Sequence, residues 1–316
     1  MPARILDGAK IAADIKAEVA EEIRALAAQG LRPGLAAILA GSNPASEIYV
    51  RNKTKTSESL GIYSETITPS ASVTTEELLA MVADLNQRAE IDGILVQLPL
   101  PPQVDAKRVL LAVAPEKDVD GFHPVNVGNL STQRPGLVPC TPAGCMEILR
   151  RSGIEVAGKN AVVVGRSDIV GKPVAMLLLN ANATVTVCHS KTRDLLAVCR
   201  SAEILVAAIG RAGMIDRGFV RPGATVIDVG INKITSRAEL EKFFPGNAQR
   251  AQAFAKNGST LVGDVHPEVA EVAGALTPVP GGIGPLTIAM LMSNTVKAMK
   301  LRRGTRLGEA VPVGRR

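Results

Sequence analysis

The sequence predicts an α/β protein built from two doubly wound lobes, and two observations support this prediction. Short apolar runs of strand length alternate with segments in which apolar residues recur at helical spacing, which is typical of a parallel sheet covered by helices. The 316 residues also exceed the usual size of a single hydrophobic core. We therefore expect two lobes.

The first series of elements begins with a helix over residues 9–28, which ends before Gly30, a common helix-stop residue. Thr74 or Thr75 is expected to cap a later helix because two glutamates follow closely. Apolar spacing and the flanking prolines and glycines place the other elements. We expect strands at 34–41, 62–68 and 92–102 and helices at 44–60 and 74–89.

A second series follows the turn-rich stretch at 137–144, with helices expected at 145–153 and 171–181 and strands at 160–165, 183–190, 202–210 and 224–231. Residues 235–257 are polar with helical spacing and are interpreted as a surface insertion. Because the series is complete by about residue 275, an apolar helix starting near Pro285 is expected to return to the first lobe. The predicted division is 1–140, 141–277, a returning helix at 278–302, and a basic, disordered tail at 303–316.

The net charge of +6 does not indicate a nucleic-acid or membrane partner, because it is confined to the C-terminus. Lys297–Arg316 contains seven basic residues and one acidic residue, which leaves 29 of each sign in the rest of the chain. The four cysteines form no C-x-x-C pair and the three histidines are scattered, so we expect buried thiols and no metal. The acidic first helix resembles no targeting segment, and a cytoplasmic protein is expected.

A candidate nucleotide site lies where the strand at 160–165 runs into GRSDIVGKP and then a helix, a layout that presents backbone N–H groups to a phosphate. Gly165, Ser167 and Gly171 depart from the G-x-G-x-x-G pattern, so the alternative is a tight turn without a ligand. Because strand, turn and helix follow in the required order, the nucleotide interpretation is favoured.

The end of the next strand usually selects the cofactor, with an acid for NAD and a basic or neutral residue for NADP. After Cys188 no carboxylate occurs until Asp194. Ser190 can donate to a 2′-phosphate, and Arg166 or the basic residues after Ser190 could neutralise it. The sequence therefore favours NADP.

Candidate catalytic groups lie in the first lobe. Tyr49 and Lys53 are four residues apart on a predicted helix and project from the same face, although a solvated lysine above a half-buried tyrosine is the simpler alternative. Gln97 interrupts an apolar strand at its carboxyl end, where open α/β sheets bind ligands. Asp118 and Asp120 lie in a turn-forming loop, where solvation of the turn is the alternative role. The rigid proline-glycine loop TPVPGGIGP can approach a flat ligand closely.

Seven segments, taken in order, closely resemble the bifunctional methylenetetrahydrofolate dehydrogenase/cyclohydrolase family. They are Tyr49-x-x-x-Lys53, VQLPLP at 96–101, KDVDGFHPVNVG at 117–128, PCTPAG at 139–144, VVGRSDIVGKP at 163–173, GDVHPEV at 263–269 and TPVPGGIGPLT at 277–287. The match is collinear and spans about residues 4–300. The insertion at 235–257 and the basic tail after Leu301 depart from the family, which leaves partners rather than chemistry in doubt.

The resemblance implies a catalytic lobe and a Rossmann-like NADP-binding lobe with a cleft between them. It also implies a homodimer that acts in one-carbon metabolism and purine biosynthesis. It implies oxidation of 5,10-methylenetetrahydrofolate to 5,10-methenyltetrahydrofolate with NADP, followed by hydrolysis to 10-formyltetrahydrofolate. It implies that Lys53 serves the hydrolysis, with Gln97 tuning it and a partly dry cleft lowering its pKa. Tyr49 would position the lysine, and Asp120 would hold the pterin ring. The implied substrate contacts are Tyr49, Val96, Gln97, Leu98, Asp120, Pro278, Gly281 and Gly282, and the implied NADP contacts are Gly165, Arg166, Ser167, Ser190 and Ile231.

Three alternatives remain open at this point. A short-chain dehydrogenase also carries Tyr-x-x-x-Lys, but there the nucleotide glycines precede the pair, whereas here they follow it. A non-catalytic binding protein on the same fold is disfavoured by the presence of Tyr49, Lys53, Gln97 and Asp120 together. A dehydrogenase without cyclohydrolase activity can be excluded only by kinetics.

Overall fold

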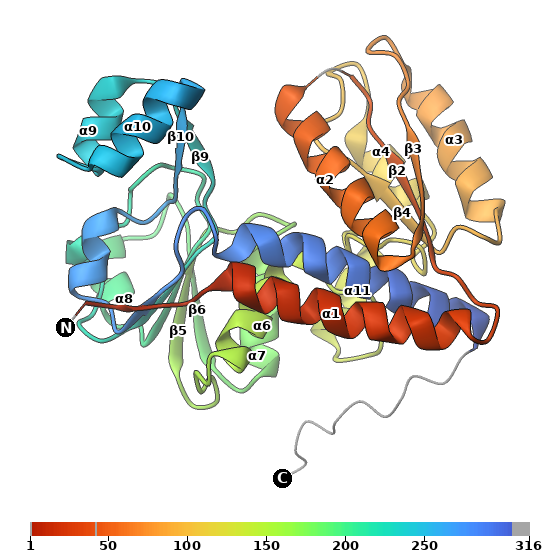
Figure 1. Ribbon diagram of the computed structural model, residues 1–316. Coiled ribbons are helices and arrows are strands. Elements are labelled where there is room, and N and C mark those ends of the chain that lie inside the picture. Colours follow the sequence, from red (N-terminus) through yellow and green to blue (C-terminus); the bar gives the residue numbers. More distant parts are fainter. Residues whose placement is uncertain (1, 42, 305–316) are drawn as a thin grey trace. The chain divides into compact units, whose positions relative to one another are not determined.

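The computed structural model describes residues 2–41 and 43–304 (Figure 1). Within this part the chain divides into two compact units. The outer unit comprises 13–140 together with 288–304, and the central unit comprises 2–12 with 141–287. Residues 2–12 and the segment 278–287 thus group with the central unit. From the sequence, 1–12 was expected in the first lobe and 278–287 in the returning helix.

The outer unit contains a parallel three-stranded sheet in the order β3-β2-β4. Its strands are β2 (Gly34–Ile38), β3 (Tyr63–Ile67) and β4 (Gly93–Val96), and its shorter helices are α2 (Pro44–Leu60), α3 (Thr75–Gln87), α4 (Ala106–Ala112) and α5 (Pro124–Ser131). Aliphatic side chains of β2, β4, α3 and α4 form its core. All five residues of β2 are buried, as expected for a central strand covered on both faces.

Thr74 caps helix α3, one of the two positions expected from the sequence. The Thr74 hydroxyl accepts a hydrogen bond from the Glu77 backbone N–H at 3.2 Å, and the Glu77 carboxylate accepts one from the Thr74 N–H at 2.8 Å. This reciprocal pair is a capping box, which satisfies two backbone donors that the helix itself cannot pair. Helix α2 has the predicted bounds.

The central unit contains a six-stranded parallel sheet in the order β1-β11-β8-β7-β5-β6. Its strands are β1 (Arg4–Ile5), β5 (Asn160–Val164), β6 (Thr184–Cys188), β7 (Ile204–Ala207), β8 (Thr225–Asp228) and β11 (Ala275–Leu276). The remaining elements are α6 (Cys140–Arg151), α7 (Gly171–Asn180), α8 (Leu195–Arg200) and the 3₁₀ turns η1 (Arg217–Phe219) and η2 (Pro267–Glu271). Because β5 lies between β6 and β7, the chain reverses its direction across the sheet at β5, and such a switch point is where doubly wound folds bind ligands.

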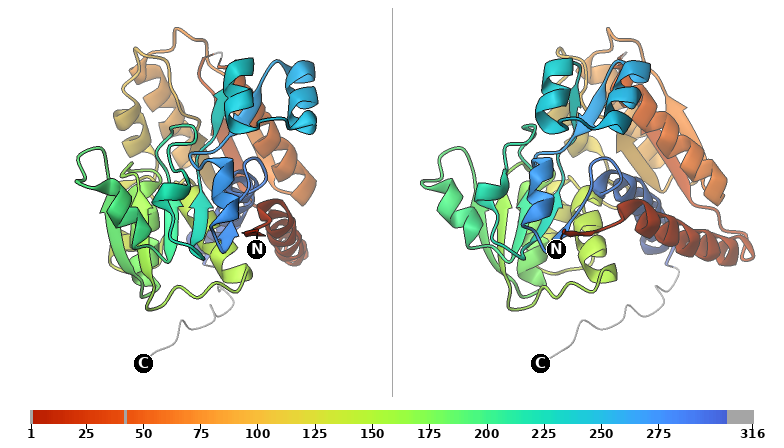
Figure 2. Two further views of the ribbon diagram at one scale, coloured as in Figure 1. Left: turned by 90° about the vertical axis from the view of Figure 1, so that its left-hand side faces the viewer. Right: turned by 60° about the vertical axis from the view of Figure 1, so that its left-hand side comes forward.

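The insertion at 235–257 is helical, as its spacing predicted. Helices α9 (Arg237–Phe243) and α10 (Ala248–Asn257) are joined to an antiparallel ribbon of β9 (Asn232–Ile234) and β10 (Thr260–Val262). Ile234, Phe243 and Val262 form a small separate core there, with Phe244 packed against it. Figures 1 and 2 show α9 and α10 at the end of this ribbon.

Two long helices, α1 (Gly8–Ala27) and α11 (Ile283–Arg303), each continue from the central unit into the outer unit. They lie side by side in Figures 1 and 2, and Lys300 forms an ion pair with Glu22. Arg303 was assigned to a disordered tail by the sequence analysis, and the structure corrects this. Arg302 and Arg303 end α11 and bind the fully buried Asp92 carboxylate at 2.6 and 2.7 Å. Residues 305–316 of that predicted tail lie outside the described residues.

Among the described residues, no helix combines the length and apolar character needed to cross a membrane, and no group of acidic, histidine or cysteine side chains could hold a metal ion. All four cysteines are buried thiols without a disulfide.

Candidate active site

Lys53 of helix α2 and Gln97 at the end of β4 form a direct contact in the outer unit. Lys53 is only 8% exposed, and its Nζ donates to Gln97 Oε1 at 3.1 Å. Gln97 Nε2 donates in turn to the Leu98 carbonyl at 2.7 Å, just before the cis peptide bond that joins Leu98 to Pro99. A buried ammonium group needs polar partners, and Gln97 supplies one without neutralising its charge.

Tyr49 lies one helical turn before Lys53 and is 39% exposed. Its ring is therefore available at the surface of the outer unit, on the face of α2 that carries Lys53. Partial burial raises the pKa of the Tyr49 hydroxyl, so this group remains protonated at neutral pH. A protonated phenol both donates and accepts hydrogen bonds, which suits contact with a polar ring system.

The structure separates the roles of the two aspartates in KDVDG. Asp118 is buried, and its Oδ2 accepts hydrogen bonds from the His123 backbone N–H at 2.8 Å and from Asn126 Nδ2 at 2.9 Å. Asp118 therefore has a structural role in the loop. Burial raises the pKa of Asp120 to about 6, while the nearby Lys53 charge opposes the rise. Asp120 is thus an electrostatic neighbour of Lys53, and its carboxylate is left for another partner.

Gly121 makes this arrangement possible. Its φ is 71°, and a Cβ at this position would lie 2.6 Å from the Pro139 nitrogen. Only glycine satisfies both conditions without a shift of the backbone. The tight packing places the Asp120 loop against the segment that leads into α6.

Two further residues near Asp120 were not identified from the sequence. Asn294 of α11 donates through Nδ2 to the Val119 and Val138 carbonyls, both at 2.8 Å, and so fixes the backbone before Asp120. Cys140 Sγ donates to the Val119 carbonyl at 3.3 Å, and burial holds the pKa of this thiol well above its usual range. A single asparagine in an apolar helix was the available signal for Asn294, because a buried amide requires partners.

In the central unit, the glycine turn after β5 meets the end of β7. Gly165 has a φ of 127°, and a Cβ there would lie 2.1 Å from the Ala208 carbonyl oxygen. Gly171 begins α7, where a Cβ would lie 2.3 Å from the Gly165 carbonyl oxygen. The Ser167 hydroxyl accepts hydrogen bonds from the backbone N–H groups of Val170 and Gly171, both at 3.2 Å. Ser167 thus shapes the turn, and its own O–H proton is left to donate.

This turn lies at the carboxyl edge of the sheet, beside the switch point between β5 and β7. Arg166 and Ser190 are exposed at the ends of β5 and β6, and Ile231, which follows β8, is 46% exposed. The sequence predicted these three residues as nucleotide contacts, and the structure places all of them after carboxyl ends of strands in one sheet. A dinucleotide with a 2′-phosphate fits this edge, because a close backbone turn, a hydroxyl and a guanidinium group are present and no carboxylate follows β6 before Asp194.

The proline-glycine loop, residues 277–282, connects β11 to α11 in the central unit. Gly281 has a φ of 103°, and a Cβ on Gly282 would lie 2.6 Å from the Pro278 carbonyl oxygen. The peptide bond between Val279 and Pro280 is cis. The loop is therefore a compact turn that only this combination of glycines and prolines forms easily.

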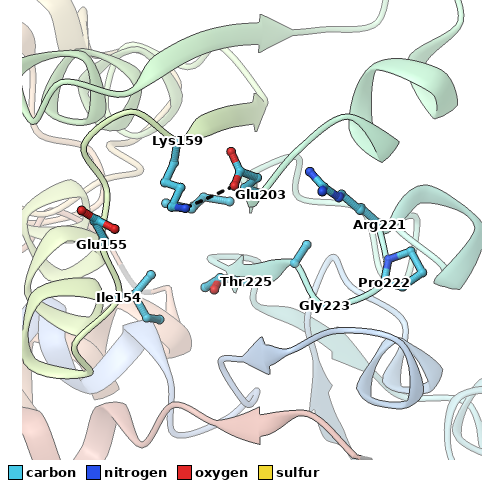
Figure 3. Close-up of a pocket in the computed structure, with 10 residues that line it drawn as sticks. Ile154, Glu155, Lys159, Glu203, Arg221, Pro222, Gly223 and Thr225 are labelled. Atoms are coloured by element: carbon cyan, nitrogen blue, oxygen red, sulfur yellow. Dashed lines mark hydrogen bonds and ion pairs between the residues drawn. The ribbon is translucent and has the colours of Figure 1, made fainter.

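A cavity of about 250 Å³ lies elsewhere in the central unit, at the amino ends of β5, β7 and β8 (Figure 3). Its wall includes Lys159 and Glu203, which form an ion pair at 3.3 Å, together with Arg221. The carboxyl ends of the same strands carry the glycine turn and its neighbours. The cavity therefore lies at the edge opposite the candidate nucleotide site.

Comparisons with known proteins match both halves of the chain. Residues 6–120 match the catalytic domain of tetrahydrofolate dehydrogenase/cyclohydrolase, and residues 139–303 match its NAD(P)-binding domain. The chain belongs to the tetrahydrofolate dehydrogenase/cyclohydrolase family. The family that the seven motifs resembled is thereby confirmed, as is the predicted pair of α/β lobes with a Rossmann-like domain.

Curated relatives in this dehydrogenase/cyclohydrolase family cover nearly the whole chain. The bifunctional protein FolD of Koribacter versatilis is 75% identical over 304 residues, which is 96% of this chain and 99% of the relative. FolD of Solibacter usitatus is 63% identical over 302 residues, or 95% of this chain and 99% of the relative. Both relatives are named as bifunctional proteins, and each is similar to this chain along nearly its whole length.

Solved structures of the family have the same fold. The bifunctional FolD enzyme of Campylobacter jejuni has a TM-score of 0.86 and 42% identity, with 95% of this chain and 99% of that chain covered. The Trypanosoma brucei methylenetetrahydrofolate dehydrogenase-cyclohydrolase, solved with NADP and an inhibitor, has a TM-score of 0.86 and 40% identity. That comparison covers 97% of this chain and all of the trypanosomal chain.

Proposed function

We propose that the enzyme oxidises 5,10-methylenetetrahydrofolate to 5,10-methenyltetrahydrofolate with NADP and then hydrolyses the product to 10-formyltetrahydrofolate. One observation carries the assignment of residues: the buried Lys53 ammonium group donates to Gln97 beside the Asp120 carboxyl group, within the unit that matches the family's catalytic domain. Neither Lys53 nor Gln97 is required by the fold alone.

The oxidation step makes few demands on acid or base groups. NADP, which Gly165, Arg166 and Ser190 would hold, would supply the hydride acceptor for the carbon that bridges N5 and N10; loss of a hydride from that carbon leaves a resonance-stabilised methenyl cation. The residues therefore act mainly by holding the substrate, because alignment supplies most of the advantage in such a transfer. Asp120 accepts hydrogen bonds from the amino and ring N–H groups of the pterin, and Tyr49 contacts the ring system.

The hydrolysis step needs proton transfer, and Lys53 is the group placed to provide it. Water attacks the methenyl carbon, and a proton must leave the attacking water and reach a folate nitrogen before the ring opens. Gln97 holds the Lys53 Nζ through the 3.1 Å hydrogen bond, so the amine keeps one orientation during this exchange. We assign Lys53 as the catalytic residue, with Tyr49, Gln97 and Asp120 as its partners.

The remaining assignments follow from position in each unit. Val96 and Leu98, which flank Gln97, are proposed to contact the folate, as are Pro278, Gly281 and Gly282 of the proline-glycine loop. The proposed NADP contacts lie at the carboxyl edge of the central sheet. They are Gly165, Arg166, Ser167, Ser190 and Ile231.

We also propose that the enzyme is a cytoplasmic homodimer that supplies one-carbon units for purine biosynthesis. Strand β6 is an edge of the central sheet. Val187 on this strand is 40% exposed, and Leu179 in the preceding helix is 54% exposed. An unpaired sheet edge is a common pairing surface. Four buried thiols without a disulfide fit a reducing compartment. Sedimentation equilibrium would test the dimer, and a single species of monomer mass would refute it.

The activity is tested by mixing the purified protein with 5,10-methylenetetrahydrofolate and either NADP or NAD. Reduced cofactor and the methenyl chromophore are followed together. NADPH formation with little methenyl accumulation is expected, because the second activity removes the intermediate. Lys53→Ala should form NADPH with accumulation of methenyltetrahydrofolate, and unchanged hydrolysis of added methenyltetrahydrofolate by this variant would refute the role of Lys53.

A further inference from the structure

The proline-glycine loop at 277–282 is held in place by hydrogen bonds from two sides. The Ala9 backbone N–H donates to the Gly281 carbonyl at 3.0 Å, and Arg250 Nη2 donates to the Val279 carbonyl, also at 3.0 Å. The first bond comes from the start of α1, and the second comes from a side chain in the insertion. Both partners belong to the same unit as the loop.

Arg250 is itself fixed by a set of contacts that leaves its guanidinium group little freedom. Nη1 donates to the Thr260 hydroxyl at 3.2 Å and to the Leu261 carbonyl at 3.3 Å, and the guanidinium carbon lies 4.4 Å from the centre of the Phe244 ring. Stacking on an aromatic face while donating in plane is a geometry that arginine provides and lysine does not. The Arg250 side chain thus connects β10, the segment after α9 and the proline-glycine loop.

The helix that carries Arg250 has no counterpart in the motifs that identify the family. Helix α10 begins after the Asn247 cap, whose side chain accepts a hydrogen bond from the Arg250 N–H at 3.0 Å. The β9–β10 ribbon carries both insertion helices (Figure 2). The insertion therefore places one partly buried arginine against the loop.

We propose that Arg250 is a positioning residue for the folate, acting through the Val279 carbonyl on the shape of the proline-glycine loop. This inference rests on the proposed function, because it takes Pro278, Gly281 and Gly282 as substrate contacts. Arg250 does not touch the substrate in this account. Its hydrogen bond keeps the loop in the binding conformation before the substrate arrives.

The expected consequence is a change in substrate affinity rather than in the chemical step. Without the Arg250 bond the loop is ordered only when the folate binds, and that cost lowers the affinity. Loss of one hydrogen bond from a charged donor corresponds to about a tenfold change in affinity. Because both reactions use the same loop, KM for methylenetetrahydrofolate and KM for methenyltetrahydrofolate should rise by the same factor. KM for NADP and both kcat values should stay within about twofold.

Arg250→Met is the most informative variant, because it keeps an apolar stem against Phe244 and removes every donor. Arg250→Lys retains the charge but not the planar fork, and an intermediate rise in KM is expected. Lys256→Ala serves as the matched control, since Lys256 is exposed on the same helix. Tetrahydrofolate binding measured by calorimetry gives an affinity independent of turnover, and thermal unfolding reports on the fold.

The outcomes separate this inference from the proposed function. Equal rises in both folate KM values, with NADP KM and the Lys256→Ala control unchanged, support the positioning role. Unchanged folate KM values in Arg250→Met overturn it, and so does a parallel loss of NADP affinity with a lower melting temperature, which would indicate a purely structural role. Absence of both activities in the unmodified enzyme would instead refute the proposed function.

Discussion

The pKa of Asp120 predicts how the dehydrogenase responds to pH. Burial raises this pKa to about 6, because the charged carboxylate is disfavoured in its partly dry surroundings. In the proposed mechanism only the ionised carboxylate accepts hydrogen bonds from both the amino and the ring N–H groups of the pterin, because protonation turns one of its oxygens into a donor. The group is protonated below its raised pKa, so binding competence is lost as the pH falls through 6 and is kept above it. At about pH 5 roughly a tenth of the molecules retain the carboxylate, so kcat/KM should be about tenfold below its plateau.

Lys53 provides the internal test of this reasoning. The positive charge of Lys53 lowers the pKa of Asp120. Because methionine is uncharged, Lys53→Met should raise this pKa and move the acid limb of kcat/KM to higher pH. Lys55→Met is the matched control, because Lys55 is exposed on the same helix and should leave the limb in place. Initial rates of NADPH formation at limiting methylenetetrahydrofolate, at constant ionic strength, give the profile. An acid limb that does not move in Lys53→Met would refute the coupling between these two groups.

Three further predictions concern the frame around the sites. Gly165→Ala should raise KM for NADP at least about tenfold and leave tetrahydrofolate binding unchanged. The reason is that a Cβ would lie 2.1 Å from the Ala208 carbonyl oxygen at a residue whose φ is 127°. A KM for NADP equal to that of the unmodified enzyme would contradict this prediction. Replacing Arg302 and Arg303 together by alanine should lower the free energy of unfolding in urea by about 3 kcal/mol, since Asp92 is left buried without its two cations. The control Arg108→Ala breaks an exposed ion pair and should cost no more than about 1 kcal/mol; similar losses for both would show that burial is not decisive. Asp264→Asn should destabilise the protein by about 2 kcal/mol in the same assay, because the buried carboxylate accepts three backbone N–H bonds from residues 209–211, and an unchanged midpoint would count against this.

Much of the fold could be predicted because its elements carry local signals. Helix α2 has the predicted bounds, and the capping box at Thr74 was readable from a threonine followed by glutamate. Strands β2, β4, β5, β7 and β8 appear as apolar runs, because nearly all of their residues are buried. The sequence could not predict that the start of the chain groups with the central unit. Strand β1 is only two residues long, and it pairs with β11, which lies far away in the sequence.

The candidate site was predicted less evenly. The partnership of Lys53 and Gln97 was implied by the family resemblance, and the structure shows a hydrogen bond between these two side chains. Asp118 and Asp120 could not be separated by sequence, because both occupy one loop and differ only in what surrounds them. The dehydrogenase/cyclohydrolase family was identified from collinear motifs and not from these physical arguments.

The residues that sequence reasoning missed have a common physical cause. Arg250, Asn294 and Lys117 each donate to backbone carbonyls that are remote in sequence; the two Lys117 bonds, for example, reach the Leu85 and Arg88 carbonyls at 2.8 and 2.7 Å. A backbone carbonyl is chemically the same at every residue, so the acceptor leaves no trace in the sequence. Only the donor is visible, as a polar residue in a helix or loop with no evident partner. Such donors fix the geometry of loops, whereas the residues that touch the substrate are selected for their chemistry. Arg250 can therefore act on substrate affinity from the insertion at 235–257, which lies outside the family motifs.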